Sequence, residues 1–204
     1  MTNFHFYFAS CALLLILSTS TGLPMRNLSP ENDAQCPLLF KGLLLDIKNA
    51  LKSEDWCSPI MSDTVAIRSK AETVLACAPI LAQNFSCIGQ RKSSFDELEC
   101  LRNIMKDLAY YDALIQSYLK STIRDPKEEA KLLSPTLETI KSLREKCSLK
   151  VDEDDDSSEE DAAQMWVDNS FNNRLEMCKM MRGFYVRTIT INRAMGYISS
   201  GDHK

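Results

Sequence analysis

Apolar residues recur along the last thirty-odd residues of the chain at the spacing of an α-helix. They fall at alternating steps of four and three and so form one row along a long helix: Met177, Met181, Phe184, Thr188, Ile191, Met195 and Ile198. A second row lies on another face: Gly183, Val186, Thr190, Arg193 and Tyr197. Its mixture of small, β-branched, cationic and aromatic residues is typical of a protein interface. The helix is therefore expected to pack in its own bundle and also on another molecule, with an ordinary mixed surface as the alternative.

The same spacing predicts three earlier helices, which gives four in all. We expect them over residues 36–53, 94–122, 127–148 and 165–199. Ser94 and Glu97 form a capping box at the start of the second helix. The loops between helices are long, short and long. A short loop forces antiparallel neighbours and a long one permits parallel neighbours, so this order favours an all-α, up-up-down-down four-helix cytokine bundle with a disulfide-stapled first crossover.

The N-terminus has the features of a secretory signal peptide. An apolar run too short to span a bilayer is followed by small residues, which predicts a signal peptide over 1–22 and a mature domain over 23–204. Sequons for N-glycosylation begin at Asn27 and Asn84. No later run is long and apolar enough for a membrane anchor. We therefore expect a secreted, extracellular protein.

Cysteine usage fits an oxidising compartment. Seven cysteines follow the signal peptide, and they are interpreted as disulfide partners rather than metal ligands: Cys36, Cys57, Cys77, Cys87, Cys100, Cys147 and Cys178. Because their number is odd, one is left for a partner chain or as a free thiol. Spacing alone does not determine how the others pair.

Several classes of function are excluded by residues that the chain lacks. The single histidine after the signal peptide is His203, which removes histidine-based catalytic triads and HExxH metal sites. The acidic residues concentrate over 151–161, where we expect a solvated loop unsuited to fixed catalytic geometry. Lysines and arginines do not cluster with aromatic residues, which argues against nucleic-acid binding. The sequence therefore predicts that the chain is not an enzyme and that it binds neither a cofactor nor a metal ion.

Three segments of the chain match the motifs of one known protein family. The final helix carries the most specific match: Cys178, Phe184, Arg187, Thr190, Ile191, Arg193, Met195 and Tyr197. The second helix and the turn after it contribute Ser94-Phe95, Cys100-Leu101, Ile104, Asp107-Leu108, Tyr111 and Asp125-Pro126-Lys127. The first crossover contributes Thr73-Val74, Ala76-Cys77, Pro79, Asn84 and Ser86-Cys87. On these residues the chain resembles the interleukin-12 alpha subunit family.

The resemblance implies a cytokine subunit that acts as a heterodimer with an interleukin-12 beta-type subunit, a chain shaped like a soluble receptor. The pair would engage type I cytokine receptors, including those for interleukin-12, and promote interferon-gamma responses of T cells and natural killer cells. Arg193 would insert into a pocket of the beta subunit and meet an acidic residue there. The residues expected to contact the beta subunit are Arg193, Thr190, Val186, Gly183, Tyr197 and Arg187.

The resemblance also implies a disulfide scheme. It pairs Cys36 with Cys87, Cys57 with Cys178 and Cys77 with Cys100, and it leaves Cys147 over. Cys147 is then either a semi-buried thiol that completes the stripe of the third helix or a covalent link to the beta subunit.

Two further questions stay open on the sequence alone. Trp56, beside Cys57 at one end of the bundle, is either a core plug or an exposed receptor contact, and we hypothesise the receptor contact. The alternatives for the whole chain are an alpha-type subunit of a sister cytokine, of interleukin-23 or interleukin-27 type, and a secreted helical carrier of a small apolar ligand. In a carrier, Trp56, the tyrosines and the methionines would line a cavity instead of forming the core.

Overall fold

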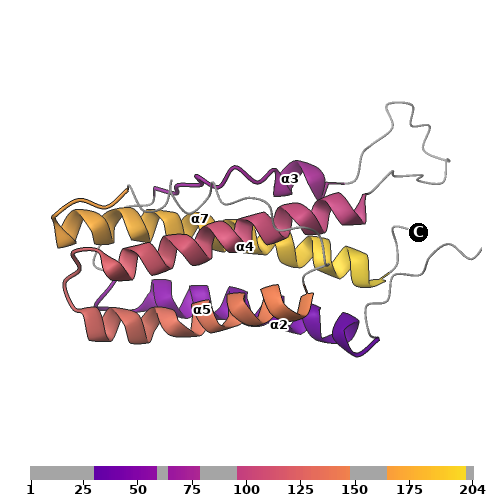
Figure 1. The fold of residues 1–204 in the computed structure, drawn as a ribbon, viewed down its shortest axis with the longest axis horizontal. Helices are drawn as coiled ribbons and strands as arrows, with labels where there is room; N and C mark the ends of the chain where they lie inside the picture. The colour runs from indigo at the N-terminus through magenta and orange to yellow at the C-terminus, as the bar shows by residue number, and fades with distance from the viewer. Residues whose placement is uncertain (1–29, 59–63, 79–95, 148–164, 201–204) are drawn as a thin grey trace, which may run out of the picture.

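The computed structural model describes residues 30–58, 64–78, 96–147 and 165–200, and all regular structure in these ranges is helical (Figure 1). The helices are α2 (Pro30–Lys52), α3 (Thr73–Ala76), α4 (Glu97–Lys120), α5 (Pro126–Cys147) and α7 (Ser170–Ser200). The all-α bundle predicted from the sequence is confirmed. The predicted signal peptide, both sequons, Cys87 and the acidic loop over 151–161 lie outside the described residues.

Links near the helix ends give the helix directions. The Cys57–Cys178 disulfide joins the turn after α2 to the first third of α7, so these two helices are antiparallel. The Cys36–Cys147 disulfide joins the first half of α2 to the last residue of α5, so these two are antiparallel as well. The short turn over 121–125 reverses the chain between α4 and α5. Hence α2 and α4 point one way and α5 and α7 the other (Figure 1).

Side chains at the helix ends explain where two boundaries differ from those expected. The carboxylate of Asp96 accepts a bond from the Glu99 amide at 3.1 Å, so α4 begins at Glu97. At the other boundary, the side chain of Asn173 accepts from the amide of Val167 at 2.9 Å and donates to its carbonyl. These bonds hold the chain in a turn before Ser170, five residues later than the predicted helix start. Helix α2 begins at Pro30, six residues earlier than expected.

The apolar row of the last helix forms the core of the bundle. Met177, Met181, Phe184 and Ile191 have no exposed surface, as the sequence pattern predicted. The ring of Phe184 stacks on Tyr111 of α4 with centroids 3.9 Å apart. Met177 and Met181 therefore pack as core residues and do not line the ligand cavity that a carrier would need. Among the described residues, no helix is both long and apolar enough to cross a bilayer.

One disulfide differs from the expected scheme. The Cys57–Cys178 and Cys77–Cys100 bonds are present. Cys36, however, bonds Cys147 and not Cys87. The two residues stand in the buried rows of antiparallel helices, at ends that meet, and their Cα atoms lie 5.8 Å apart. Cys147 is therefore neither a free thiol nor available to a partner chain. Cys87, which the expected scheme paired with Cys36, lies outside the described residues.

Candidate partner-binding surface

Four of the six residues expected to contact a partner form an open row on α7. Val186 is 45% exposed, Arg193 is exposed, and Thr190 and Tyr197 are half-buried. They recur at steps of four, three and four, so they share one face opposite the buried row. We call these four residues the α7 row.

Gly183, expected on the same surface, is buried under the crossover. A Cβ atom at this position would lie 2.0 Å from the carbonyl oxygen of Ala66, closer than a Cβ atom can approach without a shift of the backbone. The amide of Ala66 in turn donates to the carbonyl of Lys179 at 3.1 Å. We call residues 64–78 the strap. At Ala66 the backbone of the strap therefore lies directly on α7. Gly183 therefore lies beneath the strap and not on the open surface where the sequence placed it.

Arg187 is also buried, at 7% exposure, and its partner lies within the chain. Its Nε atom is 3.3 Å from Oδ2 of Asp107 on α4, a carboxylate with no exposed surface. An ion pair removed from water costs several kcal/mol in lost hydration, which its mutual attraction has to offset. Arg187 therefore pairs with Asp107 inside the chain. It does not lie on the open surface where the sequence placed it.

The strap completes the polar cluster around Asp107. The hydroxyl of Thr73 bonds the carboxylate of Asp107 and lies 3.1 Å from the carbonyl oxygen of Asn103. The amide of Glu72 donates to the side-chain oxygen of Asn103 at 2.9 Å. Strap, α4 and α7 therefore meet at one buried network of polar groups, which fixes the strap across the two helices.

Burial and hydrogen bonding act on Asp107 in opposite directions. Burial raises the pKa of its carboxyl, while bonds from Ser69 and Thr73 and the charge of Arg187 pull that pKa back down. Burial, followed by the negative charge of Asp107, also raises the pKa of the Tyr111 hydroxyl. Loss of either Asp107 or Arg187 would therefore leave a buried charge without its partner.

Trp56 is a core plug. Its side chain is 2% exposed, and its indole N–H donates to Oε2 of Glu129 at 3.1 Å. The hydroxyl of Tyr118 bonds the same oxygen. Glu129 is buried as well, so the three side chains close one end of the bundle. The hypothesis that Trp56 contacts a receptor is corrected here, because the indole would have to leave this network to reach a partner.

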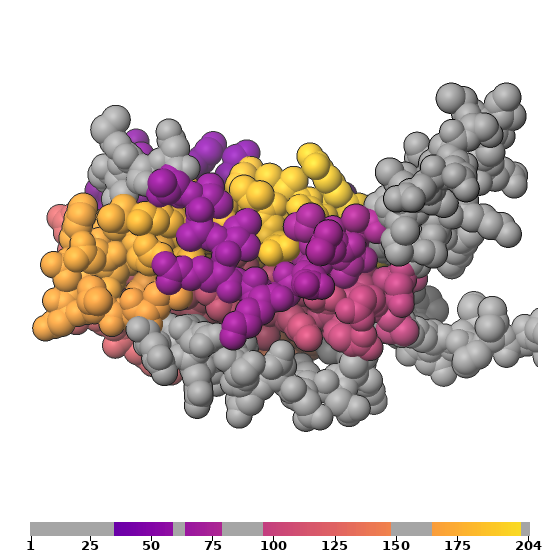
Figure 2. Space-filling view, turned by 90° about the horizontal axis from the view of Figure 1, so that it is seen from above, coloured from indigo at the N-terminus to yellow at the C-terminus, as the bar shows by residue number. Residues whose placement is uncertain are grey.

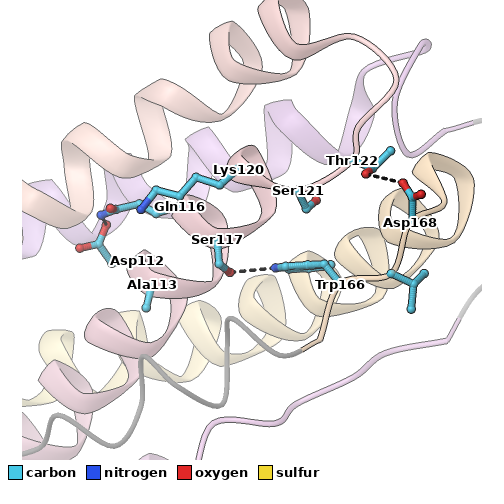
Figure 3. Close-up of a pocket in the computed structure, with 10 residues that line it drawn as sticks. Asp112, Ala113, Gln116, Ser117, Lys120, Ser121, Thr122, Trp166 and Asp168 are labelled. Carbon is cyan, nitrogen blue, oxygen red and sulfur yellow. Dashed lines mark hydrogen bonds between the residues drawn. The ribbon is translucent and has the colours of Figure 1, made fainter.

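A groove of about 620 Å³ opens beside α4, where the chain enters α7 (Figure 3). The indole N–H of Trp166 donates to the hydroxyl of Ser117 at 2.9 Å, and the hydroxyl of Thr122 donates to Asp168 at 2.9 Å. Most of the groove is lined by polar side chains. Within the ranges that the structure describes, no three His, Cys, Asp or Glu side chains gather closely enough to hold a metal ion.

Sequence reasoning missed the role of Asp107, although a signal was present. Asp107 stands between Ile104 and Tyr111 in the apolar stripe of its helix, where every neighbour on the face is buried. A carboxylate in such a stripe requires a buried partner. That partner is Arg187, which lies one turn after the core residue Phe184 on α7.

Comparisons with known proteins agree on one family. A model described as the interleukin-12 alpha subunit matches residues 4–201. Interleukin-12 subunit alpha of Capra hircus is 29% identical and that of Bos taurus 27% identical, each over 206 residues and 90% of both chains. Interleukin-12 subunit alpha of Marmota monax is 23% identical over 214 residues, covering 94% of this chain and 95% of the relative.

Proposed function

Because the chain belongs to the interleukin-12 alpha subunit family, a family of cytokine subunits and not of enzymes, we propose that it pairs with a beta-type subunit through the α7 row. The observation that carries the proposal is an exposed arginine among half-buried neighbours. Arg193 lies between Thr190 and Tyr197 on one face, and no carboxylate on α7 shares that face. Such an arrangement suits a partner whose surface supplies the carboxylate.

The chemistry of arginine explains why this residue suits the centre of an interface. Its planar guanidinium forms paired hydrogen bonds with a carboxylate, while its stem packs on apolar surface. Val186 supplies apolar surface two turns earlier, and the ring of Tyr197 supplies it one turn later. We propose that Arg193 enters a pocket of the beta-type subunit and pairs with an acidic residue there.

The remaining steps of the proposal follow from pairing. The chain is secreted, and the heterodimer engages type I cytokine receptors, including interleukin-12 receptors, and promotes interferon-gamma responses of T cells and natural killer cells. The family match favours this function over the interleukin-23 or interleukin-27 type of subunit. The filled methionine core speaks against a carrier of apolar ligands.

A receptor contact at the end of the bundle requires a different residue from Trp56. Val167, just before α7, and Phe171, in its first turn, are 54% and 56% exposed. They lie at the same end as Trp56, since Arg174 donates to the carbonyl of Asp55 at 3.5 Å. We propose that Phe171 takes the receptor-contact role. Phe171→Ala is expected to lower signalling without weakening beta-subunit binding. Unchanged signalling would show that Phe171 does not contact the receptor.

The affinity for a beta-type subunit tests the pairing. We expect Arg193→Ala to lose at least about 2 kcal/mol of heterodimer affinity, a factor of roughly 30, with unchanged helicity. Arg124→Ala, which removes an exposed arginine between α4 and α5, is the matched control and should bind normally. A loss of about tenfold or less for Arg193→Ala would reduce it to a peripheral contact.

A further inference from the structure

We infer that Asn173 is the residue that positions the receptor contact at the start of α7. This inference rests on the proposed function, in which Phe171 contacts a receptor. It names the buried side chain that holds Phe171 and Val167 in one arrangement. Three observations support it: how the amide of Asn173 is bonded, how Phe171 lies on the same turn, and how the segment before α7 is fixed to α4.

Both ends of the Asn173 side-chain amide have partners in other segments of the chain. Its Oδ1 accepts from the amide of Val167 at 2.9 Å. Its Nδ2 donates to the carbonyl of Val167 at 2.6 Å and to the carbonyl of Thr122, in the turn after α4, at 3.0 Å. These two carbonyls take up both hydrogens of the amide nitrogen. We call this set of bonds the Asn173 latch, and it ties the segment before α7 to the end of α4.

The first turn of α7 directs the latch inward and the proposed contact outward. Phe171 lies two residues before Asn173, and two residues of an α-helix turn through about 200°. Asn173 is accordingly 1% exposed, whereas Phe171 is largely exposed. Val167, which the latch holds by its backbone, also has an exposed side chain. The latch therefore fixes how these two apolar side chains lie relative to each other.

Two further bonds hold the segment before α7 against the end of α4 (Figure 3). The indole of Trp166 bonds the hydroxyl of Ser117, and the hydroxyl of Thr122 bonds the carboxylate of Asp168. Thr122 and Asp168 are exposed, so water competes for their bond. The bonds of Asn173 are shielded from water, because its side chain is buried. Asn173 is therefore expected to contribute more than the Thr122–Asp168 bond to the order of this segment.

The latch lies well away from the α7 row. Val186, where the row begins, stands roughly 20 Å further along the helix than Phe171. Figure 2 shows the start of α7, in orange, at one end of the bundle, while the strap, in purple, crosses the molecule nearer its middle. A change at Asn173 should therefore weaken receptor binding and leave pairing with the beta-type subunit intact. The cause is entropic, since a loose segment has to be ordered when the receptor arrives.

Asn173→Asp in the full chain, paired with a beta-type subunit, tests the inference. The carboxylate keeps the shape of the side chain and accepts from the Val167 amide, but it offers no hydrogen to the two carbonyls. We expect the affinity for the receptor chain that binds at Phe171, measured with soluble ectodomains of interleukin-12-type receptors, to fall at least about tenfold. Affinity for the beta-type subunit should stay at the wild-type value, and hydrogen exchange over residues 165–172 should rise.

The matched control is Asn172→Ala, because Asn172 is an exposed asparagine in the same turn of α7. It should leave receptor affinity and hydrogen exchange unchanged. Thr122→Val is a second variant that leaves the core as it is and removes the bond to Asp168. It should weaken receptor binding by about threefold, less than Asn173→Asp does. If Asn173→Asp does not fold, Thr122→Val decides the question, and raised exchange with wild-type receptor affinity would overturn the inference.

The outcomes separate this inference from the proposed function. Wild-type receptor affinity of Asn173→Asp, together with weakened receptor binding of Phe171→Ala, would overturn the positioning role and leave the receptor contact in place. Equal losses for Asn173→Asp and Asn172→Ala would also overturn it, as would an equal loss of beta-subunit affinity, because the effect would then not pass through the latch. Wild-type receptor binding of Phe171→Ala would overturn the proposed receptor contact itself.

Discussion

Two sets of residues on α7 look alike in the sequence and differ in the fold. Gly183 and Arg187 lie under the strap, whereas Val186, Thr190, Arg193 and Tyr197 remain open. Each set contains an arginine, and the sequence assigned all six residues to one partner surface. The difference teaches that interface composition reveals a contact but not whether the contact lies within the chain or with another molecule.

The covered set makes an interface within the chain by the same chemistry that is proposed for the open one. Gly183 permits close approach of a backbone, and Arg187 meets a carboxylate that burial has removed from water. If this comparison is right, changes in the covered set reduce the stability of the alpha chain, and changes in the open set reduce affinity alone.

The largest expected effect is at the buried ion pair. Arg187→Met should lower the free energy of unfolding by about 3–5 kcal/mol, because it leaves the Asp107 carboxylate buried without a counter-ion. Chemical denaturation measures the change. Arg193→Met, on the open set, should change stability by less than about 0.5 kcal/mol.

A double variant sharpens this prediction. Arg187→Met combined with Asp107→Leu removes both charges and should recover most of the loss, since apolar replacements of a buried ion pair are often neutral or stabilising. If the double variant were no more stable than Arg187→Met alone, the unpaired carboxylate would not be the cause of the loss.

Gly183→Ala should cost about 1–3 kcal/mol of stability, because its Cβ would press on the carbonyl of Ala66 and shift the strap. Hydrogen exchange over residues 64–78 should rise at the same time. Gly196→Ala is the matched control on the same helix, where a Cβ meets nothing within 4 Å. It should stabilise by about 0.5–1 kcal/mol, since glycine disfavours a helix interior. Equal effects at both positions would contradict the contact between the strap and α7.

The smallest expected effect is a pH dependence at Asp107. Burial raises the pKa of its carboxyl above the ordinary value of 3.8, so the native state binds a proton at a higher pH than the unfolded chain does. The contribution of this carboxyl to stability is therefore complete below 3.8 and is lost as pH rises through the native value. Relative to Asp107→Asn, the wild type should gain stability on acidification from about pH 7 to about pH 4. A relative loss on acidification would show that Arg187 holds the carboxylate charged.

The sequence predicted the helices and the core, because apolar spacing is a local property of the chain. Met177, Phe184 and Ile191 are buried, as their helical spacing predicted. The Cys36–Cys147 bond and the burial of Trp56 depend on which helix ends meet, which local spacing does not determine.

Gly183 and Arg187 were placed on the outer surface for a related reason. A helical period gives the angle of a side chain around its helix but not what covers that angle. The strap that covers them is separated from α7 by about a hundred residues of chain. The sign that Arg187 has a partner within the chain was Asp107, a carboxylate in an apolar stripe. That residue lies on α4, so the pattern of α7 did not reveal it.

Side-chain footprinting with hydroxyl radicals, on the alpha chain alone and in the heterodimer, tests the docking surface most directly. Pairing is expected to protect Val186 and Tyr197 of the α7 row from oxidation, while Leu38 and Phe171 keep the reactivity that they show in the free chain. Protection of Leu38 or Phe171 with unchanged oxidation of Val186 and Tyr197 would place the partner on another face and contradict docking through the α7 row.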